Sequence, residues 1–227
     1  MDKKIIITGD GSHSISIPEM NVTYHSIHGA IRESKHVFIE AGLKSVRPLQ
    51  AARRLSIFEM GFGTGLNALL TFIEAEKPGR TIYYETIELS PLSDEQFKSL
   101  NYCEQLQRRD VQTIFEKLHD CDWEKEIVIT ENFTFKKSKI NLVNFETVEL
   151  FQLIYFDAFD PIVQPELWTE KIFEKMFSIL EPGGILVTYS SKGDVRRAMQ
   201  AAGFIVEKLP GPPGKREIIR AAHPKFT

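Results

Sequence analysis

A glycine-rich stretch, Phe58 to Leu70, constrains the fold of this chain more than any other part of the sequence. It reads FEMGFGTGLNALL: an apolar run that ends in an acid, three glycines at alternate positions, and an apolar pattern with helical spacing. Glycine permits positive φ values and lets a ligand approach the main chain closely. The first turn of a following helix leaves N–H groups free for a docked group. The stretch predicts a buried strand, a tight turn and a helix that begins at a ligand site; a tight turn without a ligand is the alternative.

The composition is that of a soluble globular domain. With 227 residues, 42% of them hydrophobic, the chain can form one α/β domain with a large core. The formal net charge of −3 excludes a strongly basic nucleic-acid-binding body, so any contact with a polyanion must be local. Two cysteines without a C-x-x-C pair fit a reducing compartment, and no apolar run suits a membrane span or signal peptide. We therefore expect a cytoplasmic protein.

The residues before the glycine turn predict a small extension. Short β-type runs at Ile5–Thr8 and Ser14–Ile17 flank a Gly-Asp-Gly turn and indicate a hairpin. Residues 24–43 predict a helix ending at Gly42, with four apolar side chains on its inner face: Ile31, Val37, Phe38 and Leu43. We expect residues 1–56 to pack as an N-terminal extension on a domain of residues 57–227.

Three histidines fall close together in the extension: His25, His28 and His36. A metal site would need further ligands, but no cysteine lies near them and no H-E-x-x-H spacing occurs. We expect no metal here, and instead a structural role or a lid over a substrate.

An acid follows the second predicted strand. Thr81–Ile87 is rich in β-branched and tyrosine residues and ends at Glu88, some distance beyond the glycine turn. Nucleoside-binding α/β folds hold a ribose by its hydroxyls with an acid about 20 residues after that turn. Glu88 is therefore a predicted ribose ligand, with an exposed acid at a strand end as the alternative.

The rest of the chain alternates strands and helices. Apolar runs at Phe151–Phe156 and Ile185–Tyr189 are typical of parallel strands buried on both faces. The other expected elements are a mainly helical section at 93–122, strand pieces at 133–137 and 139–143, helices at 165–180 and 194–202, and late strands at 204–209 and 217–221. This order predicts an α/β fold with a mostly parallel seven-stranded sheet, helices on both faces and an antiparallel edge strand. Glu59, Glu88 and Asp157 should then surround one crevice at the carboxyl ends of the strands.

The glycine spacing resembles motif I of the S-adenosylmethionine (SAM) methyltransferases. The third glycine comes one residue earlier than in the dinucleotide pattern G-x-G-x-x-G, which would require glycine at Leu66. In the methyltransferase family the turn faces the methionine part of the cofactor, and the fold is Rossmann-like (class I). The resemblance implies SAM as the cofactor and the following binding residues: Glu59, Met60, Gly61, Phe62, Gly63, Thr64, Gly65, Asn67, Glu88, Asn141 and Asp157.

A second motif, D-x-F-x-P, comprises Asp157, Phe159 and Pro161. It resembles the motifs of amino-group methyltransferases, in which an acidic residue is followed by an aromatic one. An alkyl amine has a reference pKa of roughly 10 and must present a lone pair to react. A carboxylate can hold the amine in position while the aromatic ring packs beside it. We expect Asp157 and Phe159 to be catalytic; whether Asp157 also removes a proton is left open, and a turn-forming aspartate is the alternative.

Matches along most of the chain resemble one family, the MnmC/MnmD-type tRNA 5-aminomethyl-2-thiouridine methyltransferases. The most specific segments are G-F-G-T-G-L-N, the extended motif D-x-F-x-P-x-x-x-P-x-x-W and the late P-G-K-R-E. The resemblance implies N-methylation of 5-aminomethyl-(2-thio)uridine at the tRNA wobble position. It also implies the anticodon stem-loop as partner and an upstream complex that installs the aminomethyl group. MnmC carries an additional FAD-dependent oxidase domain; this chain ends at Thr227, and we expect no flavin.

The resemblance assigns eight residues to the substrate: Tyr24, His25, Glu33, Ser34, Pro161, Trp168, Lys215 and Arg216. Two features depart from the family. Asn141 aligns where an acid contacts the adenine, and the chain is slightly acidic for a tRNA-binding protein. A phosphate-facing patch would consist of Lys192, Arg196, Arg197, Lys215, Arg216 and Arg220, or these residues form an ordinary solvated surface. A methyltransferase of a small-molecule or protein amine is the alternative function.

Overall fold

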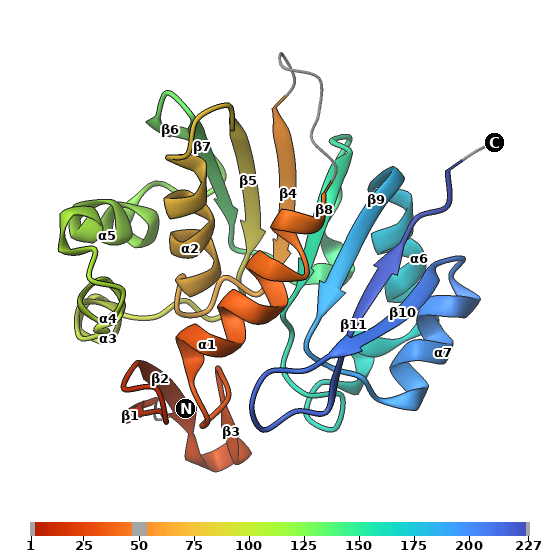
Figure 1. Cartoon of the computed structure of the whole chain (residues 1–227), viewed down its shortest axis with the longest axis horizontal. Helices are drawn as coiled ribbons and strands as arrows, with labels where there is room; N and C mark the ends of the chain where they lie inside the picture. Colours follow the sequence, from red (N-terminus) through yellow and green to blue (C-terminus); the bar gives the residue numbers. More distant parts are fainter. Residues whose placement is uncertain (1–2, 47–53, 226–227) are drawn as a thin grey trace.

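The computed structural model describes residues 3–46 and 54–225, which are built around one twisted sheet (Figure 1). The eight strands lie in the order β10-β11-β9-β8-β4-β5-β7-β6. Their bounds are β4 Leu55–Met60, β5 Ile82–Ile87, β6 Glu126–Thr130, β7 Phe133–Ser138, β8 Phe151–Phe156, β9 Leu180–Thr188, β10 Ile205–Pro210 and β11 Glu217–Ala222. The five central strands from β7 to β9 run parallel, and antiparallel pairs flank them on both sides.

The predicted α/β class is confirmed, but the predicted strand count of seven is wrong. The additional strand is β6, which pairs antiparallel with β7. Its sequence EIVIT alternates a buried Ile129 with an exposed Val128, as suits an edge strand. The strand piece predicted at 139–143 is also wrong: Asn141 caps a 3-10 turn, Leu142–Asn144, by accepting a hydrogen bond from the Val143 N–H. At the other side, β10 is the edge strand and pairs antiparallel with β11, which lies between β10 and β9.

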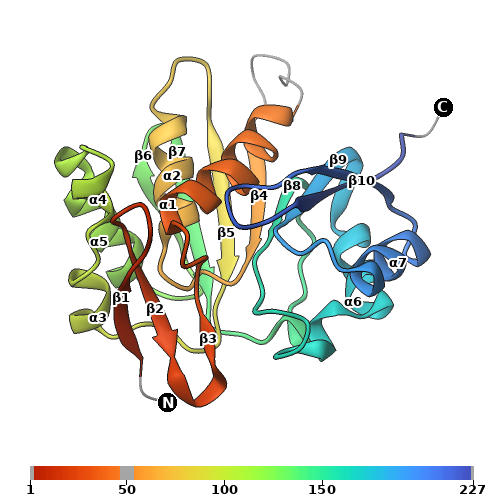
Figure 2. The ribbon, with the colours of Figure 1, turned by 60° about the horizontal axis from the view of Figure 1, so that its bottom comes forward.

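Helices cover both faces of the sheet (Figures 1 and 2). One face packs against helices in the first half of the chain: α1 Ala30–Ser34, the π-helix Lys35–Glu40, α2 Leu66–Ala75, α3 Asp94–Lys98, α4 Tyr102–Gln105 and α5 Gln112–Asp120. The other face packs against α6 Glu170–Ser178 and α7 Gly193–Ala201. Alternation along each strand explains the two cores, because Ile57 joins the first and Phe58 the second.

The N-terminal residues form a separate small sheet of three antiparallel strands: β1 Lys4–Ile7, β2 His13–Ile17 and β3 Val22–Thr23. The predicted hairpin is confirmed, and β3 extends it. The helix predicted at 24–43 begins later, at Ala30, and continues as a π-helix; its four predicted inner side chains are buried in the first core. The division at residues 56 and 57 stays a prediction, and the structure places that boundary inside β4.

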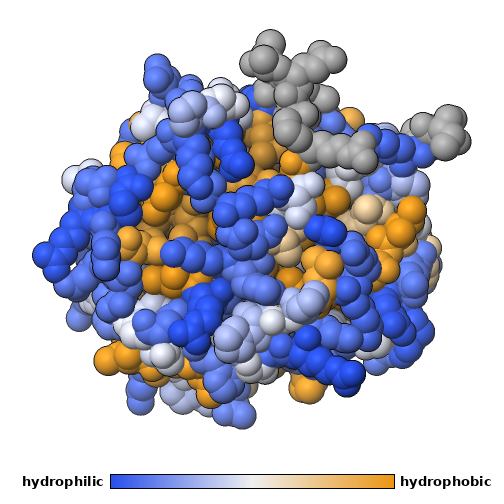
Figure 3. Space-filling view, viewed as in Figure 1, coloured by the Kyte–Doolittle hydropathy of each residue, from blue (hydrophilic) through white to orange (hydrophobic). Residues whose placement is uncertain are grey.

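The surface on this side of the molecule is mixed. Hydrophilic residues cover most of the face seen in Figure 3, with hydrophobic patches between them. Among the described residues, no helix combines the length and hydrophobicity that a membrane crossing requires.

The register of the central strands brings three predicted residues together. Met60, the last residue of β4, lies opposite Ile87 of β5 and Phe156 of β8. Gly61, Glu88 and Asp157 follow these three residues directly, so they meet at one edge. The chain leaves β4 toward β5 on one side and returns to β8 on the other, which is the switch point where open α/β sheets bind ligands.

Candidate active site

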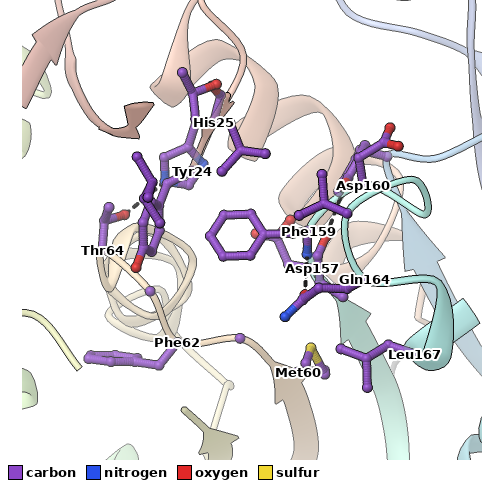
Figure 4. A pocket seen from close by; sticks show the side chains of 18 of the residues that line it. Tyr24, His25, Met60, Phe62, Thr64, Asp157, Phe159, Asp160, Gln164 and Leu167 are labelled. Atoms are coloured by element: carbon purple, nitrogen blue, oxygen red, sulfur yellow. Dashed lines mark hydrogen bonds between the residues drawn. The ribbon is translucent and has the colours of Figure 1, made fainter. Parts of the chain in front are cut away.

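A cavity of about 830 Å³ lies at this edge of the sheet (Figure 4). Its walls come from the N-terminal segment, the glycine turn, the ends of β5 and β8, and the loop before β11. Fourteen predicted site residues line it: Tyr24, His25, Glu33, Met60, Gly61, Phe62, Gly63, Thr64, Asn67, Glu88, Asn141, Asp157, Phe159 and Lys215. The structure thus brings together both ends of the chain at the predicted crevice.

Six predicted site residues do not line the cavity. Glu59 and Ser34 are completely buried, and Gly65 lies at the start of α2, against His119. Pro161 and Trp168 belong to the segment after β8, and Arg216 is exposed beyond the cavity. Since none of these six residues lines the cavity, any role that they have in binding must be indirect or must involve a surface outside the cavity.

The glycine turn allows two close contacts that a larger residue would prevent. Gly61 and Gly63 have φ values of +93° and +50°. A Cβ on Gly63 would lie 2.9 Å from Cδ1 of Tyr24, and one on Gly61 would lie 2.8 Å from the carbonyl oxygen of Asp157. The turn therefore requires glycine for both its conformation and its packing.

Glu88 is held in a fixed orientation at the rim of the cavity. Its Oε2 accepts a hydrogen bond from the Gly63 N–H at 2.9 Å, and its Oε1 accepts one from the Ser90 N–H at 2.7 Å. Apolar side chains beside it, Leu89, Ile140 and Leu142, also line the cavity. A carboxylate next to an apolar wall suits a nucleoside, whose hydroxyls donate hydrogen bonds and whose base is flat and weakly polar.

Asp157 is the carboxyl group at the centre of the site. Asn67 Nδ2 donates a hydrogen bond to its Oδ2 at 2.9 Å. Burial raises the pKa of Asp157 to about 7, and the nearby Glu33 carboxyl also raises it, whereas Asn67 and Lys215 act in the opposite direction. A carboxyl group with this pKa can exchange a proton near neutral pH, as general acid–base chemistry requires.

The aromatic ring of Phe159 lies beside Asp157, against the Tyr24 ring, and its backbone is fixed by two further side chains (Figure 4). Tyr24 meets it edge-on, with 5.1 Å between ring centroids, and the two rings point toward one another across the cavity (Figure 4). The Phe159 backbone is fixed by two side chains: Trp168 Nε1 donates to its carbonyl at 2.8 Å, and Gln164 Oε1 accepts from its N–H at 3.1 Å. Trp168 thus supports the site from outside the cavity, and the sequence did not indicate Gln164.

Lys215 lines the cavity, and its ammonium group is paired within the site; its contact with the substrate stays a prediction. Its Nζ forms a 2.6 Å ion pair with Glu33 and lies 3.8 Å from the centroid of the Tyr189 ring. The Tyr189 hydroxyl in turn donates to the Ala158 carbonyl at 2.8 Å. The sequence did not indicate Tyr189, because only folding brings β9 next to the loop before β11.

The three neighbouring histidines separate in the structure. His25 Nε2 lies 2.8 Å from Thr64 Oγ1, and burial lowers the pKa of His25 to about 4. His36 Nε2 lies 2.7 Å from the Pro210 carbonyl oxygen, and His28 packs against Gly214. Within residues 3–46 and 54–225, no three His, Cys, Asp or Glu side chains gather as a metal site would require.

Comparisons with known proteins agree with this geometry. Residues 99–224 match the family described as S-adenosyl-L-methionine-dependent methyltransferase. The bifunctional tRNA 5-methylaminomethyl-2-thiouridine biosynthesis protein MnmC of Pseudomonas fluorescens is 29% identical over 210 residues, 87% of this chain and 31% of that protein. MnmC of Ralstonia nicotianae is 30% identical over 215 residues, 88% of this chain and 32% of that protein. The chain thus spans about a third of the length of these relatives.

Solved structures show the same fold. MNMC2 from Aquifex aeolicus superposes with a TM-score of 0.75 and 23% identity, over 100% of this chain and 72% of that one. Spermidine synthase from Thermotoga maritima gives a TM-score of 0.53 and 12% identity, over 99% of this chain and 69% of that one. The family match covers more than half of the chain and its strands meet at the expected ligand edge. The chain belongs to the S-adenosyl-L-methionine-dependent methyltransferase family.

Proposed function

We propose that this methyltransferase N-methylates 5-aminomethyl-(2-thio)uridine at the wobble position of tRNA, giving the 5-methylaminomethyl form. The observation that carries the proposal is the position of Asp157, a carboxyl group in the cavity beside the aromatic ring of Phe159. The likeness to the methyltransferase part of the MnmC relatives supports the choice of acceptor.

The residues at the cavity fit the cofactor SAM. When bound, SAM supplies an electrophilic methyl group on a sulfonium. Glu88 would hold the ribose hydroxyls, because two backbone N–H groups already orient its carboxylate. Leu89 and Ile140 would pack on the adenine, with Asn141 at its edge. The methionine part would lie against Gly61 and Gly63, which line the cavity without a side chain.

Asp157 would bind the acceptor amine and take up its proton. The Oδ1 atom accepts no hydrogen bond from the described residues, whereas Asn67 holds Oδ2. An amine N–H donated to Oδ1 would direct the nitrogen lone pair away from the carboxylate. Phe159 would limit the position of the amine, because Trp168 and Gln164 fix the backbone that carries its ring.

The direct test is mass analysis of tRNA nucleosides. The protein is incubated with SAM and tRNA that carries 5-aminomethyl-uridine, with or without the 2-thio group. We expect the mass of one methyl group to be added at that nucleoside. A free primary amine that is methylated equally well, in a reaction insensitive to salt, would support the alternative acceptor; no added methyl on tRNA would refute the proposal.

A pH prediction concerns Lys215. Its cation lowers the pKa of Asp157, so Lys215→Met should raise that pKa further and leave more of the acid protonated at pH 7. The reactive form is the carboxylate, so activity rises with pH, and the acidic limb of kcat/KM should move upward by about 0.5 to 1 pH unit in the variant. Lys98→Met, on the surface of α3, is the control and should leave the limb unchanged. If the acidic limb of the pH profile does not move in Lys215→Met, Lys215 does not control the pKa of Asp157.

A second prediction concerns the tRNA contact. Four of the six cations predicted to face phosphates are already paired with acids: Lys192 with Asp160, Arg197 with Asp194, Lys215 with Glu33 and Arg220 with Glu207. Arg216 is exposed and forms no ion pair among the described residues, and it directly follows Lys215 of the cavity. We propose that Arg216 contacts a phosphate near the bound nucleotide.

Arg216→Glu should therefore weaken tRNA binding by about tenfold at low salt and reduce the salt slope of log K by about 1. Arg109→Glu, a reversal of another exposed arginine, which is paired with Glu104 between α4 and α5, is the control and should bind as the wild type does. Equal weakening by both variants would indicate a general charge effect and contradict a local contact. Binding is measured with unmodified tRNA over a series of salt concentrations.

The proposal also implies a place in a reaction sequence. A primary amine on the uridine must first be installed by an enzyme complex that aminomethylates the wobble base. Such tRNA maturation, together with the free thiols Cys103 and Cys121, favours the cytoplasm as the site of action.

A further inference from the structure

The hydrogen bonds around Glu59 are incomplete if its carboxyl group is ionised. Glu59 is completely buried, and Thr86 Oγ1 donates to its Oε2 at 2.8 Å. Its Oε1 has no hydrogen-bond partner. Among the described residues no cation pairs with it, so a charge here would be buried without compensation, which is costly.

The neighbouring Asn67 side chain also has an atom without a hydrogen-bond partner. Its Nδ2 donates to Asp157 Oδ2, and its Oδ1 is buried without a partner. The Tyr84 hydroxyl is likewise buried without a partner, and Asn67 and Tyr84 both lie near enough to influence the pKa of the Glu59 carboxyl. Buried acceptors without donors are rare in folded proteins, and each requires an explanation.

The Tyr84 hydroxyl could donate to an ionised Glu59, but a proton on Glu59 also supplies the donor that Asn67 Oδ1 lacks. If Glu59 is protonated, its O–H donates to Asn67 Oδ1, and the Asn67 amide remains turned toward Asp157 as a donor. The reversed amide would present Nδ2 to an ionised Glu59 and Oδ1 to a protonated Asp157. Each arrangement places one proton on the two carboxyl groups, and the amide orientation selects which one carries it.

We propose that Glu59 is a positioning residue that donates its carboxyl proton to Asn67, which thereby keeps its own N–H directed at the carboxylate of Asp157. The acid of the glycine motif then acts on the reacting acid through Asn67, one layer below the cavity, instead of binding the cofactor as predicted.

The charged and polar surroundings agree with this assignment. Burial, opposed by hydrogen bonding from Thr86 and supported by the charge of Asp157, raises the pKa of Glu59 to about 8, with Asn67 and Tyr84 also acting to lower it. Asp157, in contrast, has the Lys215 cation near it, in addition to the Glu33 carboxyl. The proton therefore belongs on Glu59, since only Asp157 has a cation nearby to stabilise its charge.

The direct test is carbon NMR of protein with labelled glutamate carboxyl carbons. The signal that is present in the wild type and missing in Glu59→Gln belongs to Glu59. We expect it at the shift of a protonated acid at pH 6 and 7, with titration near pH 8. A carboxylate shift at pH 6 would overturn the proposal. This measurement needs no acceptor, so it is independent of whether tRNA is the substrate.

Activity provides a second test, which rests on the proposed function. Glu59→Gln keeps an N–H donor for Asn67 Oδ1 and should retain methyl transfer within about threefold of the wild type. Glu59→Leu removes the donor and should lose about 100-fold in kcat, with SAM affinity changed much less. If Glu59→Gln is as inactive as Glu59→Leu, or loses SAM binding, a charged Glu59 is required and the proposal fails. If the leucine variant does not fold, the glutamine variant and the NMR signal still decide.

Discussion

Asp157→Asn should reduce methyl transfer by about 1000-fold while SAM binding stays within a few-fold of the wild type. The amide keeps the size of the side chain, but it cannot accept a proton near pH 7 as the native carboxyl group can. General base catalysis and orientation of the amine are together worth about 10² to 10⁴ in rate. The loss should appear in kcat, because the acceptor amine and not the cofactor depends on this group.

Single-turnover rates with aminomethyl-uridine tRNA, together with calorimetric titration of SAM, separate the two effects. Asp194→Asn, a 94% exposed aspartate at the start of α7, is the matched control and should retain full activity. If Asp157→Asn methylates at the wild-type rate, Asp157 only shapes the loop and the acceptor site lies elsewhere.

Glu88→Ala should weaken SAM binding by about 100-fold. A hydrogen bond to a charged group contributes about 1.5 to 3 kcal/mol, and the lower end applies to the half-buried Glu88, so bonds from two hydroxyls amount to about 3 kcal/mol, or about 100-fold. Truncation also removes the acceptor for the Gly63 N–H and so loosens the glycine turn. The loss therefore combines a missing ligand contact with a less ordered turn, and it should appear in affinity more than in the rate at saturating SAM.

Calorimetry with SAM or its demethylated product measures this loss directly. Glu88→Gln retains one acceptor oxygen and should fall between the alanine variant and the wild type. Glu95→Ala, an exposed glutamate in α3, controls for loss of one negative charge. Unchanged affinity in Glu88→Ala would show that the ribose is held by other groups.

The cofactor side of the site could be predicted from the sequence because its residues are local. Gly61 and Gly63 adjoin the end of β4, and Glu88 directly follows β5. The residue that follows a buried strand lies at the edge of the sheet. An apolar strand pattern followed by a glycine turn is therefore sufficient to locate these residues from the sequence. Glu59 does not line the cavity for the same geometric reason: it is the last strand position but one, and its side chain is completely buried. Its contact with the cofactor stays a prediction.

The acceptor side could be predicted only in part. Asp157 and Phe159 were found from a motif, but the residues that hold them were not all evident. Trp168, whose contact with the substrate stays a prediction, donates a hydrogen bond to the Phe159 carbonyl. The Tyr189 hydroxyl donates to the Ala158 carbonyl, and the Lys215 ammonium lies over the Tyr189 ring. These contacts join segments that are far apart in the chain, so they cannot be predicted from the spacing of residues in the sequence.

The sequence by itself determined the glycine turn, the acids at the strand ends and the α/β class, because short-range periodicity controls which residues end each strand. Only the tertiary structure decided the charge balance of the site. The sequence left open whether Lys215 belongs to a phosphate-facing patch or to a solvated surface, yet Lys215 pairs at 2.6 Å with Glu33, which is 182 residues away in the chain. From the sequence, a lysine in a loop is expected to be exposed to solvent. Its contacts with a buried acid and an aromatic ring arise only in the folded chain, because these residues are far apart in the sequence.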